Sequence, residues 1–306
     1  MEITGFNLKS LPKEDVEWFW KGYLGSGLLT LVASPPKAGK STLLWELLKS
    51  MYKEEPLLGQ GTKRVSTLLF TEESYATMSN RVKKLGIEDA PVHVVTIQPG
   101  LNWNTLVPYA KNAIVKHGVK LVVLDTISRF WGLNSEDDAA EQLRALAPMF
   151  VLARHYGCAL LFIHHTRKSG GSEGRSVRGS NALTGAVDII LEFGRLSPYD
   201  ISNNRRLSSL SRFSDTPEYL IGTLTPNGYI LNADGDSETE RSIITIISER
   251  EGITSAELAE ELNCSERQVQ RVLAQLTGRG VLVRHGSGAG KSPFSYTLAG
   301  SDGEGG

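Results

Sequence analysis

Apolar residues gather in short runs along the first two thirds of the chain, and each run ends at turn-forming or charged residues. Apolar runs of four to eight residues are typical of strands that are buried on both faces of a sheet. Between the runs, apolar residues follow the three- and four-residue spacing of amphipathic helices. We expect strands at 27–34, 66–73, 92–97, 120–126, 159–165 and 187–193, and helices at 41–53, 77–85, 104–117 and 137–156.

This alternation of strands and helices predicts an α/β domain with a mostly parallel sheet and helices on both of its faces. Two more strand-like runs follow, and the Asn227–Gly228 pair inside the second predicts a hairpin. An acidic stretch with turn character, ADGDSETE, begins at Ala233. We therefore expect the first domain to cover residues 1–233.

The last part of the chain has a different pattern. Capping residues, each followed three positions later by Glu or Gln, occur at Ser237, Thr254 and Ser265 and predict three short helices. Two strand-like runs around a Gly/Ser-rich tip come next. This order predicts a winged helix-turn-helix over residues 238–298, followed by a flexible tail at 299–306.

Charge is unevenly divided within this C-terminal unit. Residues 237–264 carry two Arg and seven Glu, whereas residues 265–293 carry four Arg, one Lys and one Glu. In the helix that starts near Ser265, the apolar stripe leaves a polar face that we expect to contact DNA. The predicted DNA contacts of this helix and of the hairpin are Arg267, Gln268, Gln270, Arg271, Arg284 and Lys291. Docking of a protein partner is the alternative.

The stretch ASPPKAGKST, residues 33–42, lies between a predicted strand and a predicted helix. Apart from its first position it follows the pattern G-x-x-x-x-G-K-[ST], in which backbone N–H groups at a helix start bind phosphates. Ser34 replaces the first glycine, but Pro35 restricts Ser34 to extended angles that any residue accepts. A Gly/Pro turn that happens to contain a lysine is the alternative. The predicted ATP-binding residues are Pro36, Lys37, Ala38, Gly39, Lys40, Ser41, Thr42 and Asp125.

Asp125 ends a predicted buried strand, so its carboxylate should emerge at the carboxyl edge of the sheet beside the phosphate loop. There Asp125 and the hydroxyl of Ser41 would hold Mg²⁺, while Lys40 neutralises the β and γ phosphates. A residue that merely caps the next segment is the alternative for Asp125.

Two acids and two histidines follow other strands at the same edge. Glu72 and Glu73 close the strand STLLFTEE, and one of them could act as the general base; we choose Glu72, although the sequence leaves open which of the two faces the site. His164 and His165 close the strand ALLFIHH, where one could sense the γ-phosphate or both could be structural.

The loop after these histidines, TRKSGGSEGRSVRGSN, is rich in glycine and cations. A cationic loop that leaves a phosphate sensor is expected to contact a phosphodiester backbone, and a solvated surface loop is the alternative. Its predicted DNA contacts are Arg167, Lys168, Arg175 and Arg178.

Composition restricts the class of protein. A length of 306 residues with 40% hydrophobic and 22% charged residues predicts two globular units and no membrane partner. The net charge of −1 gives no global sign of nucleic acid. Two distant cysteines and an acidic N-terminal stretch without a basic head favour a reducing cytoplasm without an export signal.

The order of these motifs resembles the RecA-like P-loop ATPases, specifically the plasmid RepA-type and phage ring-helicase branch of the hexameric replicative helicases, over residues 12–232. The stretches that carry the resemblance are VEWFWKGYLGSGLLTLVASPPKAGKST, LLFTEES, KLVVLDTISRF, LLFIHHTRKSG, VRGSNALTGAVDIILE and SRFSDTPEYLI. It implies that Glu72 is the catalytic glutamate, that His165 senses the γ-phosphate and that Arg178 lies in or beside the DNA-contacting loop. It also implies that Arg212 reaches the nucleotide of a neighbouring subunit.

Our leading hypothesis from the sequence is an ATP- and Mg²⁺-dependent DNA helicase that forms a ring, expected to be a hexamer, with single-stranded DNA in its channel. The winged helix would bind duplex DNA or a loading partner. An ATP-switched DNA-binding regulator and a recombinase-like filament ATPase, neither of which unwinds DNA, are the alternatives.

Overall fold

The computed structural model describes residue 9 and residues 15–133, 138–165, 182–196, 202–232, 235–250, 252–278, 280–286 and 293–298. They form two compact units. The first contains Met1–Gly194 and Ser208–Tyr219, and the second contains Arg195–Leu207 and Leu220–Gly306. Compactness alone does not define an independently folding domain, so the boundary near residue 233 stays a prediction.

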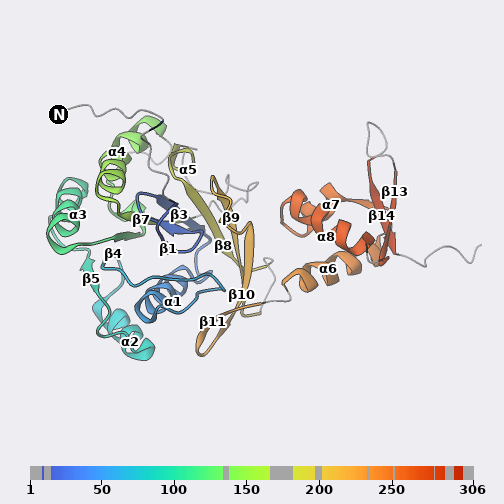
Figure 1. Cartoon of the computed structure of the whole chain (residues 1–306), viewed down its shortest axis with the longest axis horizontal. Helices are drawn as coiled ribbons and strands as arrows, with labels where there is room; N and C mark the ends of the chain where they lie inside the picture. The colour runs from blue at the N-terminus through green and yellow to red at the C-terminus, as the bar shows by residue number, and fades with distance from the viewer. Residues whose placement is uncertain are drawn as a thin grey trace, which may run out of the picture. The chain divides into compact units, whose positions relative to one another are not determined.

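Within the described residues, the main sheet has nine strands in the order β11-β10-β9-β8-β3-β7-β6-β4-β5 (Figure 1). Strands β3 to β8 pair in parallel where they neighbour one another, whereas β10 and β11 form an antiparallel hairpin. The strands are β3 (Leu29–Ser34), β4 (Thr67–Thr71), β5 (Val92–Thr96), β6 (Leu121–Asp125), β7 (Ala159–His165), β8 (Ile189–Gly194), β9 (Asn204–Ser211), β10 (Tyr219–Thr225) and β11 (Gly228–Leu231). A separate pair, β1 (Trp18–Trp20) and β2 (Leu24–Gly25), precedes β3.

The central strands form where the apolar runs predicted them. Every residue of β3, β4 and β6 is buried, which is the pattern of strands covered on both faces. The predicted hairpin is also present: Thr225 pairs with Gly228, so Pro226 and Asn227 make its turn. The predicted fold class, an α/β domain with a largely parallel sheet, is confirmed.

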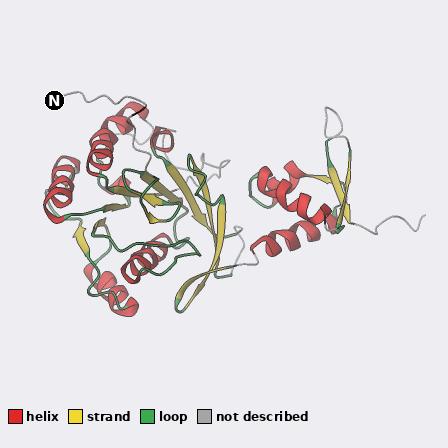
Figure 2. Ribbon diagram, in the orientation of Figure 1, coloured by secondary structure: helices red, strands yellow, loops and turns green. Residues whose placement is uncertain are grey.

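Helices cover both faces of this sheet, as Figure 2 shows. Leu29, Leu31 and Ala33 of β3 belong to the core that α3, α4 and α5 cover, so the alternating Thr30, Val32 and Ser34 face the side of α1. The helices are α1 (Lys40–Lys53), α2 (Tyr75–Leu85), α3 (Trp103–His117), α4 (Ala139–Tyr156) and α5 (Ala182–Ala186). Among the residues that the structure describes, no helix combines the length and the apolar character needed to cross a lipid bilayer.

Side chains that cap helices fix where three of these helices begin. The side chains of Ser74, Asn102 and Asp138 accept hydrogen bonds from backbone N–H groups of the first turns of α2, α3 and α4. Such caps satisfy donors that the helix itself cannot pair. They define the ends of the loops that connect the helices to the carboxyl ends of the strands.

The described part of the C-terminal unit contains three helices and a three-stranded sheet of order β12-β14-β13. Its elements are α6 (Gly235–Glu249), β12 (Ile253–Thr254), α7 (Ser255–Glu261), α8 (Glu266–Gly278), β13 (Leu282–His285) and β14 (Ser295–Leu298). Thr254 and Glu257 form the predicted capping box, but α6 begins at Gly235, so Ser237 lies inside that helix. The helix-turn-helix prediction for this part of the chain is confirmed.

Candidate nucleotide site

The phosphate loop, residues 35–39, joins the buried strand β3 to α1. Ser34 is the last residue of β3 and pairs with His165, a strand position that requires no glycine. Gly39 precedes the helix with a φ of 108°, a backbone angle that favours glycine. Lys37, at a φ of 62°, also adopts a left-handed conformation. Backbone N–H groups at the start of α1 therefore face a loop that can bind an anion.

The residues of this loop differ in exposure. Pro36 and Lys37 are exposed, whereas Ala38 is buried and Gly39, Ser41 and Thr42 are partly buried. Lys40 is buried, and its Nζ donates to the carbonyl oxygens of Ser34 at 3.3 Å and Pro35 at 3.0 Å.

Lys40 also contacts the last residue of a neighbouring strand, since its Nζ lies 3.2 Å from Nδ1 of His165. Burial lowers the pKa of Lys40, while the nearby carboxylates of Asp125 and Glu72 oppose that change. A lysine held in this way carries a charge that anionic phosphate oxygens would stabilise.

Asp125 is the most perturbed acid of this edge. It is the last residue of β6, and only 5% of its surface is exposed. Its pKa is raised to about 7, mainly by burial and also by the carboxylates of Glu73 and Glu72, while Lys40 and Arg81 act in the opposite direction. A divalent cation would relieve this repulsion, and Asp125 with the hydroxyl of Ser41 supplies the oxygen ligands that Mg²⁺ prefers. The residues present therefore fit a magnesium ion.

Glu72 and Glu73 both lie beyond the end of β4, at Thr71, so strand alternation does not separate them as the sequence suggested. Glu73 is the more enclosed: its carboxylate accepts a hydrogen bond from Nε1 of Trp45 at 3.1 Å and lies 3.4 Å from Nη2 of Arg81. Glu72 is 36% exposed, and its Oε2 lies 2.8 Å from Nε of Arg129. Water can therefore reach Glu72 more readily than Glu73.

The two histidines at the end of β7 point to opposite faces of the sheet. His164 is 1% exposed, and its ring meets that of Trp131 edge to face at 6.0 Å. His165 contacts Lys40 instead. Of the two, only His165 lies beside the phosphate loop.

Arg212 does not join this group of residues. Its Nη1 lies 4.0 Å from Oδ1 of Asp188, which directly precedes β8, and Oδ2 of Asp188 accepts a hydrogen bond from the N–H of Leu29. Leu29 begins β3 and Ser34 ends it, so the two edges are about 16 Å apart at 3.3 Å per residue. Arg212 therefore lies at the amino edge of the sheet, beyond reach of its own phosphate loop.

The predicted DNA contacts of the C-terminal unit require one correction. Gln268 is 3% exposed, so it lies on the buried side of α8 and not on the exposed face that was predicted for it. Arg267, Gln270 and Arg271 are exposed, as expected for that face. On the wing, Arg284 lies 4.2 Å from the ring centre of Phe294.

Five of the predicted DNA contacts lie outside the described residues. They are Arg167, Lys168, Arg175 and Arg178, from the segment predicted to be a loop, and Lys291, from the predicted hairpin.

Three residues of the site were missed by the sequence reasoning: Trp45, Arg81 and Arg129. Arg129 follows Asp125 by four positions, inside the 3₁₀ turn η2 (Ile127–Arg129). Arg81 lies two helical turns into α2, where a cation can turn back toward the preceding acids. The two arginines could thus have been predicted from their spacing relative to the acids. Nothing in the sequence distinguishes Trp45 from the other apolar residues of α1.

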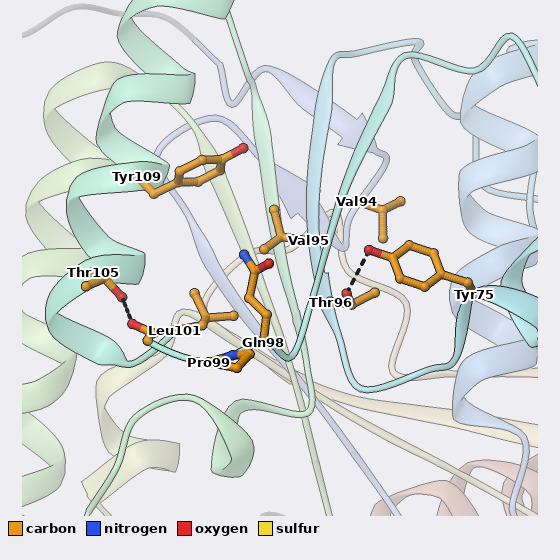
Figure 3. Close-up of a pocket in the computed structure, with 10 residues that line it drawn as sticks. Tyr75, Val94, Val95, Thr96, Gln98, Pro99, Leu101, Thr105 and Tyr109 are labelled. Carbon is orange, nitrogen blue, oxygen red and sulfur yellow. Dashed lines mark hydrogen bonds between the residues drawn. The ribbon is translucent and has the colours of Figure 1, made fainter.

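A pocket of about 440 Å³ lies at the outer end of the sheet (Figure 3). Residues of β5, of the segment that follows it and of helices α2 and α3 line it, and all of these side chains are uncharged. The Thr96 hydroxyl donates to Tyr75 Oη at 3.2 Å. Because Thr96 pairs with Thr71 of β4, the pocket shares the carboxyl edge with the phosphate site but contains none of its residues.

Comparison with known proteins agrees with this geometry. The model of a family described as "AAA domain" matches residues 4–171, and that of an "HTH domain" matches residues 239–290. A crystal structure of the RadB recombinase superposes with a TM-score of 0.51 at 17% identity, covering 68% of this chain and 91% of that one, which supports the RecA-like fold.

Two curated relatives share the name "DNA repair protein RadA". The one from Chlamydia pneumoniae is 27% identical over 247 residues, which is 78% of this chain and 48% of the relative. The one from Pseudomonas aeruginosa is 26% identical over 221 residues, or 69% and 44% of the two chains. The chain thus spans about half the length of the curated relatives it matches.

Proposed function

Because the chain belongs to the AAA domain family, we propose that it is an ATP-hydrolysing protein that acts on DNA in the manner of a RecA-like recombinase. One observation carries the ATPase part of this proposal: Lys40, Asp125, Glu72 and His165 meet at the carboxyl edge of one sheet. The relatives named for DNA repair and the recombinase fold favour this function over the helicase expected from the sequence.

Binding of the triphosphate uses the phosphate loop. Phosphate oxygens replace the carbonyl oxygens of Ser34 and Pro35 as acceptors for Lys40, and the N–H groups at the start of α1 hold the remaining charge. A magnesium ion held by Ser41 and Asp125 would neutralise charge on the phosphates.

Hydrolysis requires a base for the attacking water. Glu72 accepts the proton of this water, because it is close enough to interact with Lys40 and Asp125 and still open to solvent. Glu73 instead helps to hold α1 and α2 beside the site through Trp45 and Arg81.

His165 connects the nucleotide to the DNA-binding loop. It contacts Lys40 and directly precedes residues 166–181, the predicted DNA-binding loop. Loss of the γ-phosphate would therefore change the surroundings of His165, and this change would reach the loop. The loop cations Arg167, Lys168, Arg175 and Arg178 would bind single-stranded DNA. Arg267, Gln270, Arg271 and Arg284 would bind duplex DNA, together with Lys291.

Arg212 gives this function an oligomeric requirement. Since it lies at the amino edge, it can act on a nucleotide only if the phosphate site of a second copy is placed against it. The proposal therefore includes a homo-oligomer in which each Arg212 completes the neighbouring site, and a hexameric ring is the form implied by the resemblance to ring helicases.

Three DNA assays separate this function from its alternatives. Wild-type protein with ATP is expected to pair a labelled single strand with a homologous duplex, and Lys40→Ala is expected to abolish this pairing. Displacement of a labelled strand from a forked duplex without pairing would instead establish the helicase. A sequence-specific footprint with neither activity would establish an ATP-switched regulator.

A further inference from the structure

Arg129 is an exposed cation in a turn whose other residues include buried ones. This turn, η2, follows the carboxyl end of β6. Ile127 is 0% and Phe130 is 3% exposed, whereas the side chain of Arg129 is 63% exposed. The N–H of Arg129 donates to the carbonyl oxygen of Thr126 at 3.0 Å, which closes the turn η2. The backbone of Arg129 is thus held by this hydrogen bond and by the burial of Ile127 and Phe130.

Further packing holds this turn against the strand that carries His165. The N–H of Trp131 donates to the carbonyl oxygen of Ile127 at 3.2 Å, and the Trp131 ring meets His164. The turn therefore has a defined place between the end of β6 and the end of β7, and the guanidinium of Arg129 extends from a rigid base.

Glu72 is anchored through its backbone, whereas its side chain is partly exposed. Its N–H donates to the carbonyl oxygen of Asp125 at 3.2 Å, while its side chain remains 36% exposed. A half-exposed glutamate beyond a strand end can adopt several rotamers. The contact between its Oε2 and Nε of Arg129, at 2.8 Å, selects one of them.

Stability does not account for this ion pair. Ion pairs between exposed side chains contribute little to folding, because both side chains lose freedom and water screens the charges. Orientation of a reacting group is different, since small displacements of a general base cause large losses of rate.

We propose that Arg129 is a positioning residue that holds the carboxylate of Glu72 toward the attacking water. This inference rests on the proposed ATPase function and adds to it a residue that lies outside the phosphate loop and contacts Glu72. Glu73 offers the contrast, because two donors, Trp45 and Arg81, hold its carboxylate. The contact of Arg129 is with Glu72.

The test compares steady-state ATP hydrolysis by full-length wild type, Arg129→Ala, Arg129→Lys, Glu72→Gln and the double variant. Arg129→Ala is expected to lower kcat at least tenfold while KM for MgATP changes less than twofold, and Arg129→Lys to recover part of kcat. In the Glu72→Gln background, loss of Arg129 is expected to cause no further decrease. Arg144→Ala, a change at an exposed arginine of α4, is the matched control and should resemble wild type.

Each other outcome has a defined meaning. A wild-type or increased kcat in Arg129→Ala would overturn the positioning role, and so would an equal decrease in the presence and absence of Glu72. Thermal unfolding and nucleotide-binding measurements on every variant exclude a folding defect, and Arg129→Lys keeps the test valid if Arg129→Ala does not fold. Lack of turnover by wild type would overturn the proposed hydrolysis itself, whereas full turnover by Glu72→Gln would overturn the role of Glu72 as its general base.

Discussion

The two edges of the parallel sheet place charged residues in different surroundings. At the carboxyl edge, Lys40 and Asp125 are buried, and their pKa values move in opposite directions from the ordinary ones. At the amino edge, Arg212 is 66% exposed, and its Nη1 lies 4.0 Å from Oδ1 of Asp188, which is a long ion pair. In the proposed function, the first edge binds the nucleotide and the second completes the nucleotide site of a neighbouring copy.

The largest effect is expected from Lys40→Ala, which removes the buried cation of the phosphate loop. Loss of the phosphate-binding charge should reduce ATP turnover below detection and weaken nucleotide binding, because no other described residue of the loop is a buried cation. Fluorescent-nucleotide titration and a phosphate-release assay measure the two effects. Substantial turnover in this variant would remove the distinction between the edges.

Arg212→Ala is expected to lower turnover roughly 10³-fold, the effect of losing an arginine that stabilises the transition state from a neighbouring subunit. Nucleotide binding should remain, because Arg212 contacts Asp188 at the amino edge of the sheet, and the phosphate loop follows the opposite end of β3, which is about 16 Å long. The same two assays separate turnover from binding. Unchanged turnover would make Arg212 an ordinary surface ion pair.

Asp125→Asn tests the electrostatic strain of the carboxyl edge. Burial and, to a smaller extent, the carboxylates of Glu73 and Glu72 raise the pKa of Asp125 to about 7, so the fold favours the protonated form. The contribution of protonated Asp125 to the stability of the fold is present below about pH 4 and is lost as the pH rises through about 7. We therefore compare the free energy of unfolding of the asparagine variant with that of wild type, without magnesium and nucleotide. The difference in favour of the variant should grow by ~1–4 kcal/mol from about pH 5 to about pH 8. Urea unfolding of both proteins at each pH measures these free energies. The same difference between variant and wild type at both pH values would contradict the prediction.

The smallest effect is expected from Arg154→Ala. Nη2 of Arg154 lies 3.7 Å from Asp188, and its side chain is 64% exposed, so this ion pair contributes about 0–1 kcal/mol at most. Turnover should change less than about twofold, because Asp188 keeps its hydrogen bond to Leu29. A loss as large as that of Arg212→Ala would mean that the amino edge acts as one network.

Much of the fold could be predicted because buried strands and amphipathic helices have distinct patterns. The runs at β3, β4 and β6 are apolar throughout because both faces are covered, and Val269, Val272, Leu273 and Leu276 form the predicted stripe of α8, each 0% exposed. Gln268 was wrongly placed because it lies four positions before Val272 and therefore on the same face of the helix.

The contacts that surround the candidate base could not be predicted from local pattern. Glu72 and Glu73 follow the strand end, where alternation no longer applies, and their partners come from η2, α1 and α2. Only the folded arrangement brings Arg129 to one acid and Trp45 with Arg81 to the other.

Mixing two inactive variants tests most directly whether the edges of neighbouring chains share one site. In an oligomer of Arg212→Ala and Glu72→Gln subunits, the intact phosphate site of the first can meet the intact arginine of the second. We predict that ATP turnover of the mixture rises well above that of either variant alone and is greatest near equal amounts. Turnover that never exceeds the sum of the separate variants, at any ratio, would contradict the shared site.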